Sequence, residues 1–321
     1  MTDNTVISPR AMRGLTLSVV LAVVGYFLFT LWGGVNEVRE SLSHVGWLEL
    51  TWLLLLSLLN YLLRFVRWRT FLLRLGYQLP EAANFRIYIS GFALTTTPGK
   101  AGEALRSVLL KPLGVAYPHS LAALLAERLG DLMAVLLLAC VGLYAYEPAR
   151  PVVAAVAMGF ILGLWLLQQH SLLGRFESWL TQRFQQRLAH LISGFIDTLR
   201  HSGGLLSLPL LGYSLGLGLI AWGAEGVAFY YLLQVMGAEI TLTMALFIYA
   251  FAMLVGAISF LPGGLGGAEV TMTGLLLING MESASAVAAT LVIRLTTLWF
   301  AVVLGMLAML PGHRVSRPER Q

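Results

Sequence analysis

The sequence has little charge, very few lysines and almost no cysteine. Because it holds a single cysteine, Cys140, a framework of internal disulfides is excluded. Charged residues make up 12% of the 321 positions and hydrophobic residues 58%, whereas a soluble domain is about one quarter charged. The same balance excludes a disordered chain, which combines low hydrophobicity with high charge. The composition therefore argues against both a soluble domain and a small secreted scaffold.

Long apolar runs dominate what is present. They predict an all-α polytopic membrane protein, because several reach the ~20 residues that cross a bilayer core. About six full spans are expected, at 15–32, 48–66, 121–143, 152–167, 205–235 and 284–310. Two further stretches, 85–110 and 242–278, are interrupted by Pro and Gly and predict broken-helix hairpins. We expect one transmembrane domain at 14–310, between an N-terminal flank at 1–13 and a tail at 311–321.

The basic residues indicate how the chain is oriented. The 21 Lys and Arg mostly flank apolar runs instead of gathering on a polar domain, which argues against nucleic-acid binding. Most of them lie in the N-terminal flank, at 64–86, 98–119 and 168–203, and in the tail. These segments share one side of the membrane if both termini are cytoplasmic, as the positive-inside rule requires. We therefore predict cytoplasmic termini.

Residues 172–200 differ from the predicted spans. Apolar residues recur there at three- and four-residue steps, with Arg175, Arg183 and Arg187 between them. This pattern is typical of an amphipathic helix whose apolar face lies in the membrane surface. We predict one interfacial helix over 172–200.

Two parts of the chain resemble each other. The segment 98–103, PGKAGE, is similar to 262–269, PGGLGGAE. Arg128 follows the first proline by 30 residues, and Arg294 follows the second by 32. Upstream, a glycine precedes a tyrosine by 12 residues in both places, at 76 and 88 and at 237 and 249. Similar anchors in the same order predict an internal repeat, with a first copy at about 48–143 and a second at about 205–310.

The two repeats are expected to have opposite orientations. The first hairpin opens to the cytoplasm and the second to the far side, as in transporters whose substrate site lies where inverted repeats meet. Proline removes an amide donor and glycine loosens the backbone, so each helix is expected to stop inside the membrane. Broken backbone at that depth must be buried in protein or line an aqueous cavity. The candidate hinges are Pro98, Gly99, Pro262, Gly263 and Gly264.

Ionisable residues in and beside the apolar runs are the candidate substrate-binding residues. Each costs about 2.5–3.5 kcal/mol at the bilayer centre, so each needs a reason to be there. Arginine suits a phosphate, because its planar fork donates two parallel hydrogen bonds. The alternative is that the arginines only neutralise acids and hold helices together, as buried ion pairs do. The candidates are Arg64, Lys100, Glu103, Arg106, Glu127, Arg128, Asp131, Glu225, Glu269 and Arg294.

No pattern for catalysis or for a cofactor is apparent. The six histidines show no metal-ligand spacing, and no Ser/His/Asp or Cys/His set stands out. The glycine-rich segment 263–267 lacks the Gly-Lys-Ser/Thr ending of a phosphate-binding loop. We expect no cofactor, no metal and no enzymatic activity.

Taken together, these motifs resemble the lysylphosphatidylglycerol synthase transmembrane-region family of flippase-like proteins in bacteria and archaea. The resemblance covers about residues 14–310 and is carried by 98–103 with Arg106, 127–131, 262–269 and Arg294. It implies lipid translocation between leaflets and a location in a bacterial cytoplasmic membrane. In bifunctional members a separate cytoplasmic domain makes an aminoacylated phospholipid. Because the chain ends about ten residues past the last predicted span, we expect a stand-alone member without that synthase domain.

The leading hypothesis is a flippase or transporter that moves an anionic or phosphate-bearing lipid between leaflets. Its expected partners are membrane lipids, and the sequence specifies no oligomeric state. One alternative is an ion-coupled carrier of a small anion, which inverted repeats fit equally well. The other is an intramembrane enzyme acting on a lipid-linked substrate, with acids beside arginines as general acid and base.

Overall fold

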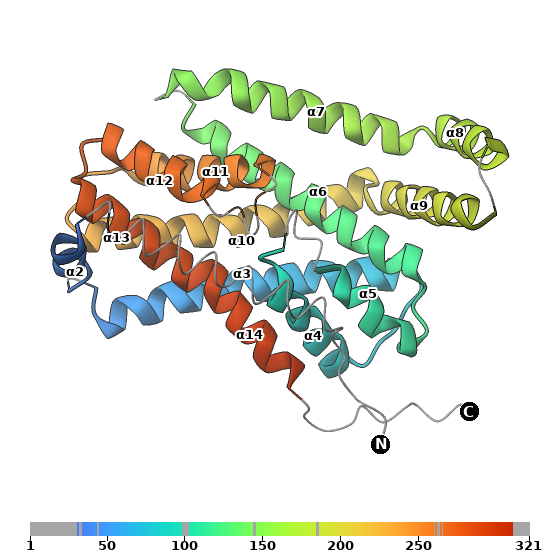
Figure 1. Cartoon of the computed structure of the whole chain (residues 1–321), viewed down its shortest axis with the longest axis horizontal. Coiled ribbons are helices and arrows are strands. Elements are labelled where there is room, and N and C mark those ends of the chain that lie inside the picture. Colours follow the sequence, from blue (N-terminus) through green and yellow to red (C-terminus); the bar gives the residue numbers. More distant parts are fainter. Residues whose placement is uncertain are drawn as a thin grey trace.

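The computed structural model describes residue 31 and residues 34–43, 45–97, 103–143, 146–183, 186–259, 261, 264 and 266–310. Over these ranges the chain forms helices and no strand (Figure 1). The predicted all-α polytopic membrane fold is therefore confirmed for this part of the chain. The first predicted span, at 15–32, lies outside the described residues apart from residue 31.

Within the described ranges, four helices are long and apolar enough to cross a bilayer. They are α3 (Trp47–Arg74), η4 with α7 (Glu147–Ala149 and Arg150–Gln168), α10 (Leu208–Val235), and the helix formed by α13 (Ser283–Arg294), the π-helical turn η6 (Leu295–Trp299) and α14 (Phe300–Met309). A further long helix, α6 (Tyr117–Val141), carries three charged residues near its middle. Its apolar ends match the predicted span at 121–143.

The helices α3 and α10 pack against each other along the centre of the molecule (Figure 1). Both have 28 residues, and both end in the same way. After α3, Gly76 adopts φ 87° and the next residue donates its N–H to the Leu72 carbonyl at 2.9 Å. After α10, Gly237 adopts φ 76° and the next residue donates to Leu233, also at 2.9 Å. Glycine favours this left-handed cap, so the repeated Gly–Tyr spacing starts from equivalent helix ends.

A pair of shorter helices follows each central helix. After α3, α4 (Glu81–Ser90) continues into η1 (Gly91–Leu94) and contacts α5 (Leu105–Leu110), which ends in η3 (Lys111–Leu113). After α10, α11 (Leu242–Ile258) contacts α12 (Gly267–Ile278). The two pairs lie where the hairpins were predicted. Pro98, Gly99, Lys100, Pro262 and Gly263 lie outside the described residues.

Of the candidate hinges, Gly264 is described. It adopts φ 70°, and a Cβ at this position would lie 3.2 Å from the Cα of Gly256 on α11. Both the left-handed backbone and the close approach require glycine here. Gly264 therefore lies directly against α11.

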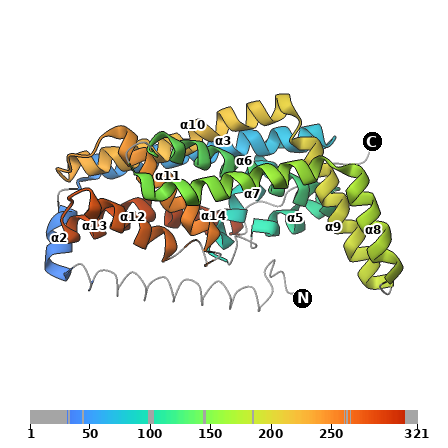
Figure 2. The ribbon, with the colours of Figure 1, turned by 90° about the horizontal axis from the view of Figure 1, so that it is seen from above.

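The prediction of a single helix over 172–200 is wrong. The chain instead forms α8 (His170–Arg183) and α9 (Gln186–Leu205), which lie side by side at one end of the molecule (Figures 1 and 2). The helix α9 packs on α6, and its residues Ile196, Ser202 and Leu205 are buried. Leu172, Phe176, Trp179 and Phe195 stay exposed, so a location of this apolar face in the membrane surface stays a prediction. At the opposite end, α2 (Val35–Ser43) packs on α13.

Candidate functional site

A cavity of about 310 Å³ lies between the two predicted repeats. Its walls come from α3, η1 and α6 in the first repeat and from α10, α11, α12 and the α13–α14 helix in the second. This volume is at the lower end of the range of small-molecule sites, about 300–1,000 Å³. The polar side chains that line it are Tyr61, Arg64, Thr95, Arg128, Asp131, Glu225, Tyr249, Arg294 and Thr297.

Arg64 and Arg128 are the cations that the first repeat contributes to the cavity wall. The Nη2 atom of each lies 3.1 Å from Oδ2 of Asp131. The Arg128 side chain keeps 23% of its surface exposed and that of Arg64 keeps 8%, so Arg128 is the more accessible. The indole of Trp222, on α10, donates a hydrogen bond to Asp131 at 3.1 Å. This bond joins the charge cluster of the first repeat to the central helix of the second.

A second layer of charges lies behind this wall. Glu127 accepts a hydrogen bond from Arg106 at 2.7 Å and lies 3.1 Å from Arg128 and 3.4 Å from Arg64. Glu103 lies 3.2 Å from Arg106 and 3.5 Å from Arg128. Buried charges are tolerated when they are paired and hydrogen-bonded, and both of these carboxylates are. Both carboxylates therefore stabilise the position of Arg128.

Aromatic rings contact Arg106, and a glycine leaves the space that its side chain occupies. Its guanidinium carbon lies 4.1 Å from the ring centroid of Tyr88 and 5.2 Å from that of Trp68, within cation–π range. The Tyr88 hydroxyl donates to Glu127 at 2.8 Å. A Cβ at Gly91 would come within 2.3 Å of the Arg106 Nε, so a side chain here would displace the guanidinium. The position of Arg106 thus depends on a glycine of η1.

Arg67 lies between α6 and α10 and is wholly buried. Its guanidinium forms a hydrogen-bonded ion pair with Asp131. A Cβ would lie 3.2 Å from the Arg67 Nη1 if placed at Gly130 and 3.3 Å if placed at Gly218. Two small residues on facing helices therefore leave the space that this arginine occupies. Arg67 positions Asp131 from behind, opposite the cavity-lining Arg64.

The second repeat contributes a smaller set of charges. Arg294 donates from Nε to Glu269 at 2.7 Å, and the other carboxylate oxygen of Glu269 accepts the backbone N–H of Gly266 at 2.7 Å. Glu269 therefore caps the start of α12 with one carboxylate oxygen and orients Arg294 with the other. On the same side of the cavity, the Tyr249 hydroxyl donates to Glu225 at 2.6 Å.

The two repeats place equivalent residues in equivalent contacts. Glu269 and Arg294 are 25 residues apart and form an ion pair at 2.7 Å, and the equally spaced Glu103 and Arg128 lie 3.5 Å apart. The tyrosines that follow the two capping glycines by 12 residues, Tyr88 and Tyr249, each donate to a buried carboxylate. These contacts are the ones expected of related segments, and the internal repeat stays a prediction.

The structure brings most of the predicted site residues together. Arg64, Arg128, Asp131, Glu225, Arg294 and the hinge Gly264 line the cavity, and Glu103, Arg106, Glu127 and Glu269 are buried behind it. Lys100 lies outside the described residues. Arg128 and Arg294 do form the ion pairs that a purely structural role requires, and they also face the cavity.

Sequence reasoning left several site residues out. Arg67 lies one helical turn from Arg64, and Tyr88 and Tyr249 are anchors of the repeat, so a signal for these three was present. Tyr61 and Trp222 line the cavity but carry no signal in the sequence that separates them from other aromatic residues in the spans. In the described part of the chain, no group of three His, Cys, Asp or Glu side chains is arranged to hold a metal ion.

The fold and the cavity define a multi-pass integral membrane protein whose charged residues gather around one central space. Residues 15–305 match the model of the family described as the lysylphosphatidylglycerol synthase TM region. The chain belongs to this family. The relatives described below are archaeal.

Two of these relatives are UPF0104 membrane proteins. One, from Methanothermobacter thermautotrophicus, is 28% identical over 91% of this chain and 90% of its own length. Another, from Pyrococcus horikoshii, is 23% identical over 93% of this chain and 97% of its own length. A third relative, the glycosyltransferase AglD of Haloferax volcanii, is 24% identical over 83% of this chain, and the match covers 49% of that protein.

Proposed function

We propose that this protein moves an anionic, phosphate-bearing lipid between the leaflets of a cytoplasmic membrane. The observation that carries the proposal is the central cavity between the repeats, with Arg64, Arg128 and Arg294 in its wall. Against these three cations the described lining holds two carboxylates, Asp131 and Glu225, so the lining favours an anion. An arginine pair in a partly desolvated space suits the oxygens of a phosphate.

The size and rim of the cavity support a lipid cargo whose head group alone is enclosed. A volume of about 310 Å³ accommodates a head group but not acyl chains. Two of the lining residues, Ala257 and Leu261, are exposed at the surface of the molecule. Acyl chains would therefore stay in the bilayer while the head group passes between the repeats, which is the geometry expected of inverted repeats around one site.

In this proposal the arginines bind the head group and the carboxylates keep the arginines in place. Arg128 and Arg294 contact the phosphate, because both line the cavity from opposite repeats. Glu103 and Glu269 hold these two arginines from behind. The paired broken helices, α4–α5 and α11–α12, act as the two gates, and both termini lie in the cytoplasm.

The test is leaflet-resolved lipid movement in proteoliposomes. Purified protein is reconstituted with head-group-labelled lipids that a membrane-impermeant reagent quenches in the outer leaflet. We expect movement of at least one anionic class, loss of this movement in Arg128→Ala and Arg294→Ala, and normal movement in Arg150→Ala. Arg150 is the matched control because its exposed ion pair with Glu147 lies outside the cavity.

Two other outcomes point to the alternatives. A lipid that changes in mass during the assay would indicate an intramembrane enzyme, because a flippase leaves its substrate intact. Uptake of a small soluble anion, without movement of any lipid and with or without a proton gradient, would indicate an ion-coupled carrier. Either result overturns the proposal.

A further inference from the structure

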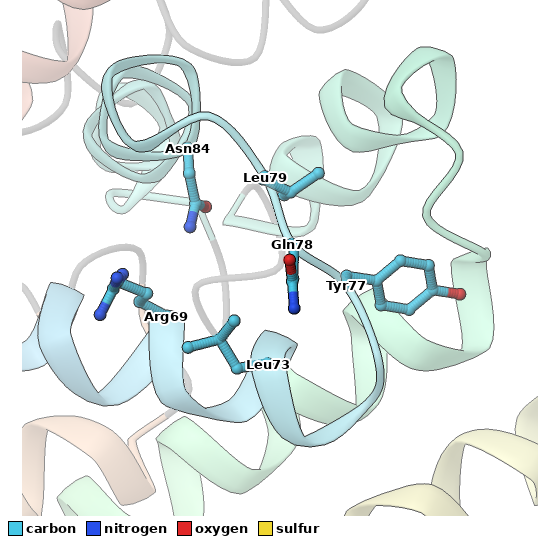
Figure 3. A pocket seen from close by; sticks show the side chains of 6 residues that line it. All are labelled: Arg69, Leu73, Tyr77, Gln78, Leu79 and Asn84. Atoms are coloured by element: carbon cyan, nitrogen blue, oxygen red, sulfur yellow. The ribbon is translucent and has the colours of Figure 1, made fainter. Parts of the chain in front are cut away.

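A second cavity lies apart from the central one, between the end of α3, the loop that follows it and the start of α4 (Figure 3). Its volume is about 250 Å³. It is lined by Arg69, Leu73, Tyr77, Gln78, Leu79 and Asn84, none of which lines the central cavity. In the predicted orientation this cavity lies at the cytoplasmic surface of the membrane, where lipid phosphates are found.

A buried neighbour sets the orientation of the Asn84 amide. The Trp68 indole N–H, which acts only as a donor, lies 3.1 Å from Oδ1 of Asn84. The amide oxygen is thereby occupied, and the amide nitrogen is the atom left for the cavity. Figure 3 shows this amide extending from α4 towards α3. Asn84 as a whole is only 3% exposed, and no described residue accepts its N–H groups, which leaves them to the cavity.

Further donors border the same space. Arg69 supplies a guanidinium with five N–H groups, one of which pairs with Glu81. The exposed side chain of Gln78 approaches from the loop, whereas the ring of Tyr77 points away from the cavity centre (Figure 3). The Arg69 and Glu81 side chains are 45% and 66% exposed, so water weakens their ion pair and an anion can compete with it.

We propose that Arg69, Gln78 and Asn84 form a second anion site, which binds a phosphate group at the cytoplasmic side. The binding itself rests on the donors that border this cavity. Its role, as the first contact of a lipid head group before the central cavity, rests on the function proposed above. Arg69 is on the same helix as Arg64, five residues further along, which is about 7.5 Å at 1.5 Å per residue. The group bound is a phosphate, either on a lipid or free in solution.

Three variants of the full chain test the site. Asn84→Asp keeps an oxygen for the Trp68 indole but replaces the donors with a carboxylate, and Arg69→Gln removes the cation. Both are expected to weaken phosphate binding about tenfold or more, the size of one or two hydrogen bonds to a charged group. Glu81→Gln removes the competing carboxylate and is expected to strengthen binding. Thermal midpoints and tryptophan fluorescence verify that each variant is folded.

Two probes distinguish the source of the phosphate. Inorganic phosphate is titrated into protein in an uncharged detergent and followed by ³¹P NMR line broadening. In parallel, the protein is placed in nanodiscs of phosphatidylcholine that contain a minor fraction of phosphatidic acid. The protein is then released, and native mass spectrometry counts the phosphatidic acid molecules that it retains. Retention of a lipid that Asn84→Asp loses identifies a head-group site, and binding of inorganic phosphate alone identifies a site for the free ion.

The decisive comparison is with Arg128→Ala, which alters the central cavity and leaves this one intact. We expect Arg128→Ala to bind the phosphate probe at this site as the unmodified protein does, even where it no longer moves lipid. The failure of one proposal therefore leaves the other testable. Equal binding of both probes by unmodified protein, Asn84→Asp and Arg69→Gln would overturn the second site.

Discussion

Replacing Gly91 by alanine tests the packing around Arg106, because packing and helix propensity predict opposite changes in the stability of the protein. Gly91 has ordinary right-handed backbone angles, φ −60° and ψ −27°, so an alanine is not strained there. On propensity alone the substitution would stabilise the protein by about 1 kcal/mol. In the structure, however, its Cβ would lie 2.3 Å from Nε and 2.8 Å from Cγ of Arg106. The sign of the effect therefore tests whether Arg106 occupies this position.

The expected magnitude follows from what Arg106 must give up. Overpacking a buried site costs about 1–3 kcal/mol. Displacing the guanidinium also weakens its contacts with Glu127 at 2.7 Å and Glu103 at 3.2 Å, and breaking a buried ion pair costs about 3–5 kcal/mol. We therefore expect Gly91→Ala to destabilise the protein by about 3 kcal/mol or more.

The assay is thermal unfolding in detergent, followed by intrinsic fluorescence, with Gly159→Ala as the matched control. Gly159 lies within α7, where a Cβ would meet no atom within 4 Å, so the control is expected to be neutral or slightly stabilising. A lower thermal midpoint for Gly91→Ala and an unchanged or higher one for Gly159→Ala are predicted. An unchanged or raised midpoint for Gly91→Ala would refute the placement of Arg106.

Three further predictions concern other parts of the molecule. His119 lies at the start of α6, before the predicted span. Burial lowers its pKa from 6.5, and the nearby His201 lowers it further. The unfolded state therefore binds more protons than the folded state just below pH 6.5, so the thermal midpoint should fall as the pH drops from 7.5 to 5.5. His119→Gln should make the thermal midpoint depend less on pH over this range. Trp222→Phe removes a donor to a buried carboxylate and should cost about 1–3 kcal/mol in unfolding free energy while slowing lipid movement; unchanged values for both would contradict its bridging role. Tyr88→Phe and Tyr249→Phe should lower the thermal midpoint by similar amounts, because the two hydroxyls make equivalent bonds; an effect in only one would argue against equivalence of the repeats.

Hydropathy and spacing predicted the fold well because they depend on local sequence. An apolar run long enough to cross a bilayer has to be a helix, since lipid offers no other partners for the backbone. The anchors of the repeat were also readable, because Gly76 and Gly237 occupy left-handed helix ends that favour glycine. The ionisable candidates could be named from their cost in the membrane alone.

Contacts between distant segments could not be predicted in the same way. The space that Arg67 fills depends on Gly130 and Gly218 facing each other across two helices, and no local pattern encodes that approach. The predicted helix over 172–200 was wrong for a related reason. The apolar periodicity continues through α8 and α9, so it does not show that the chain forms two helices packed side by side.

The central claim is that the arginines of the cavity bind a head group as well as holding helices together. The most direct test is lipid movement in the double variant Glu269→Gln, Arg294→Gln. The pair loses both charges but keeps an amide oxygen to cap α12 at Gly266 and donors for a neutral hydrogen bond, so stability should change little. We predict a thermal midpoint close to that of the unmodified protein, together with lipid movement at the protein-free background. Lipid movement at the unmodified rate would contradict the claim and leave Arg294 with a purely structural role.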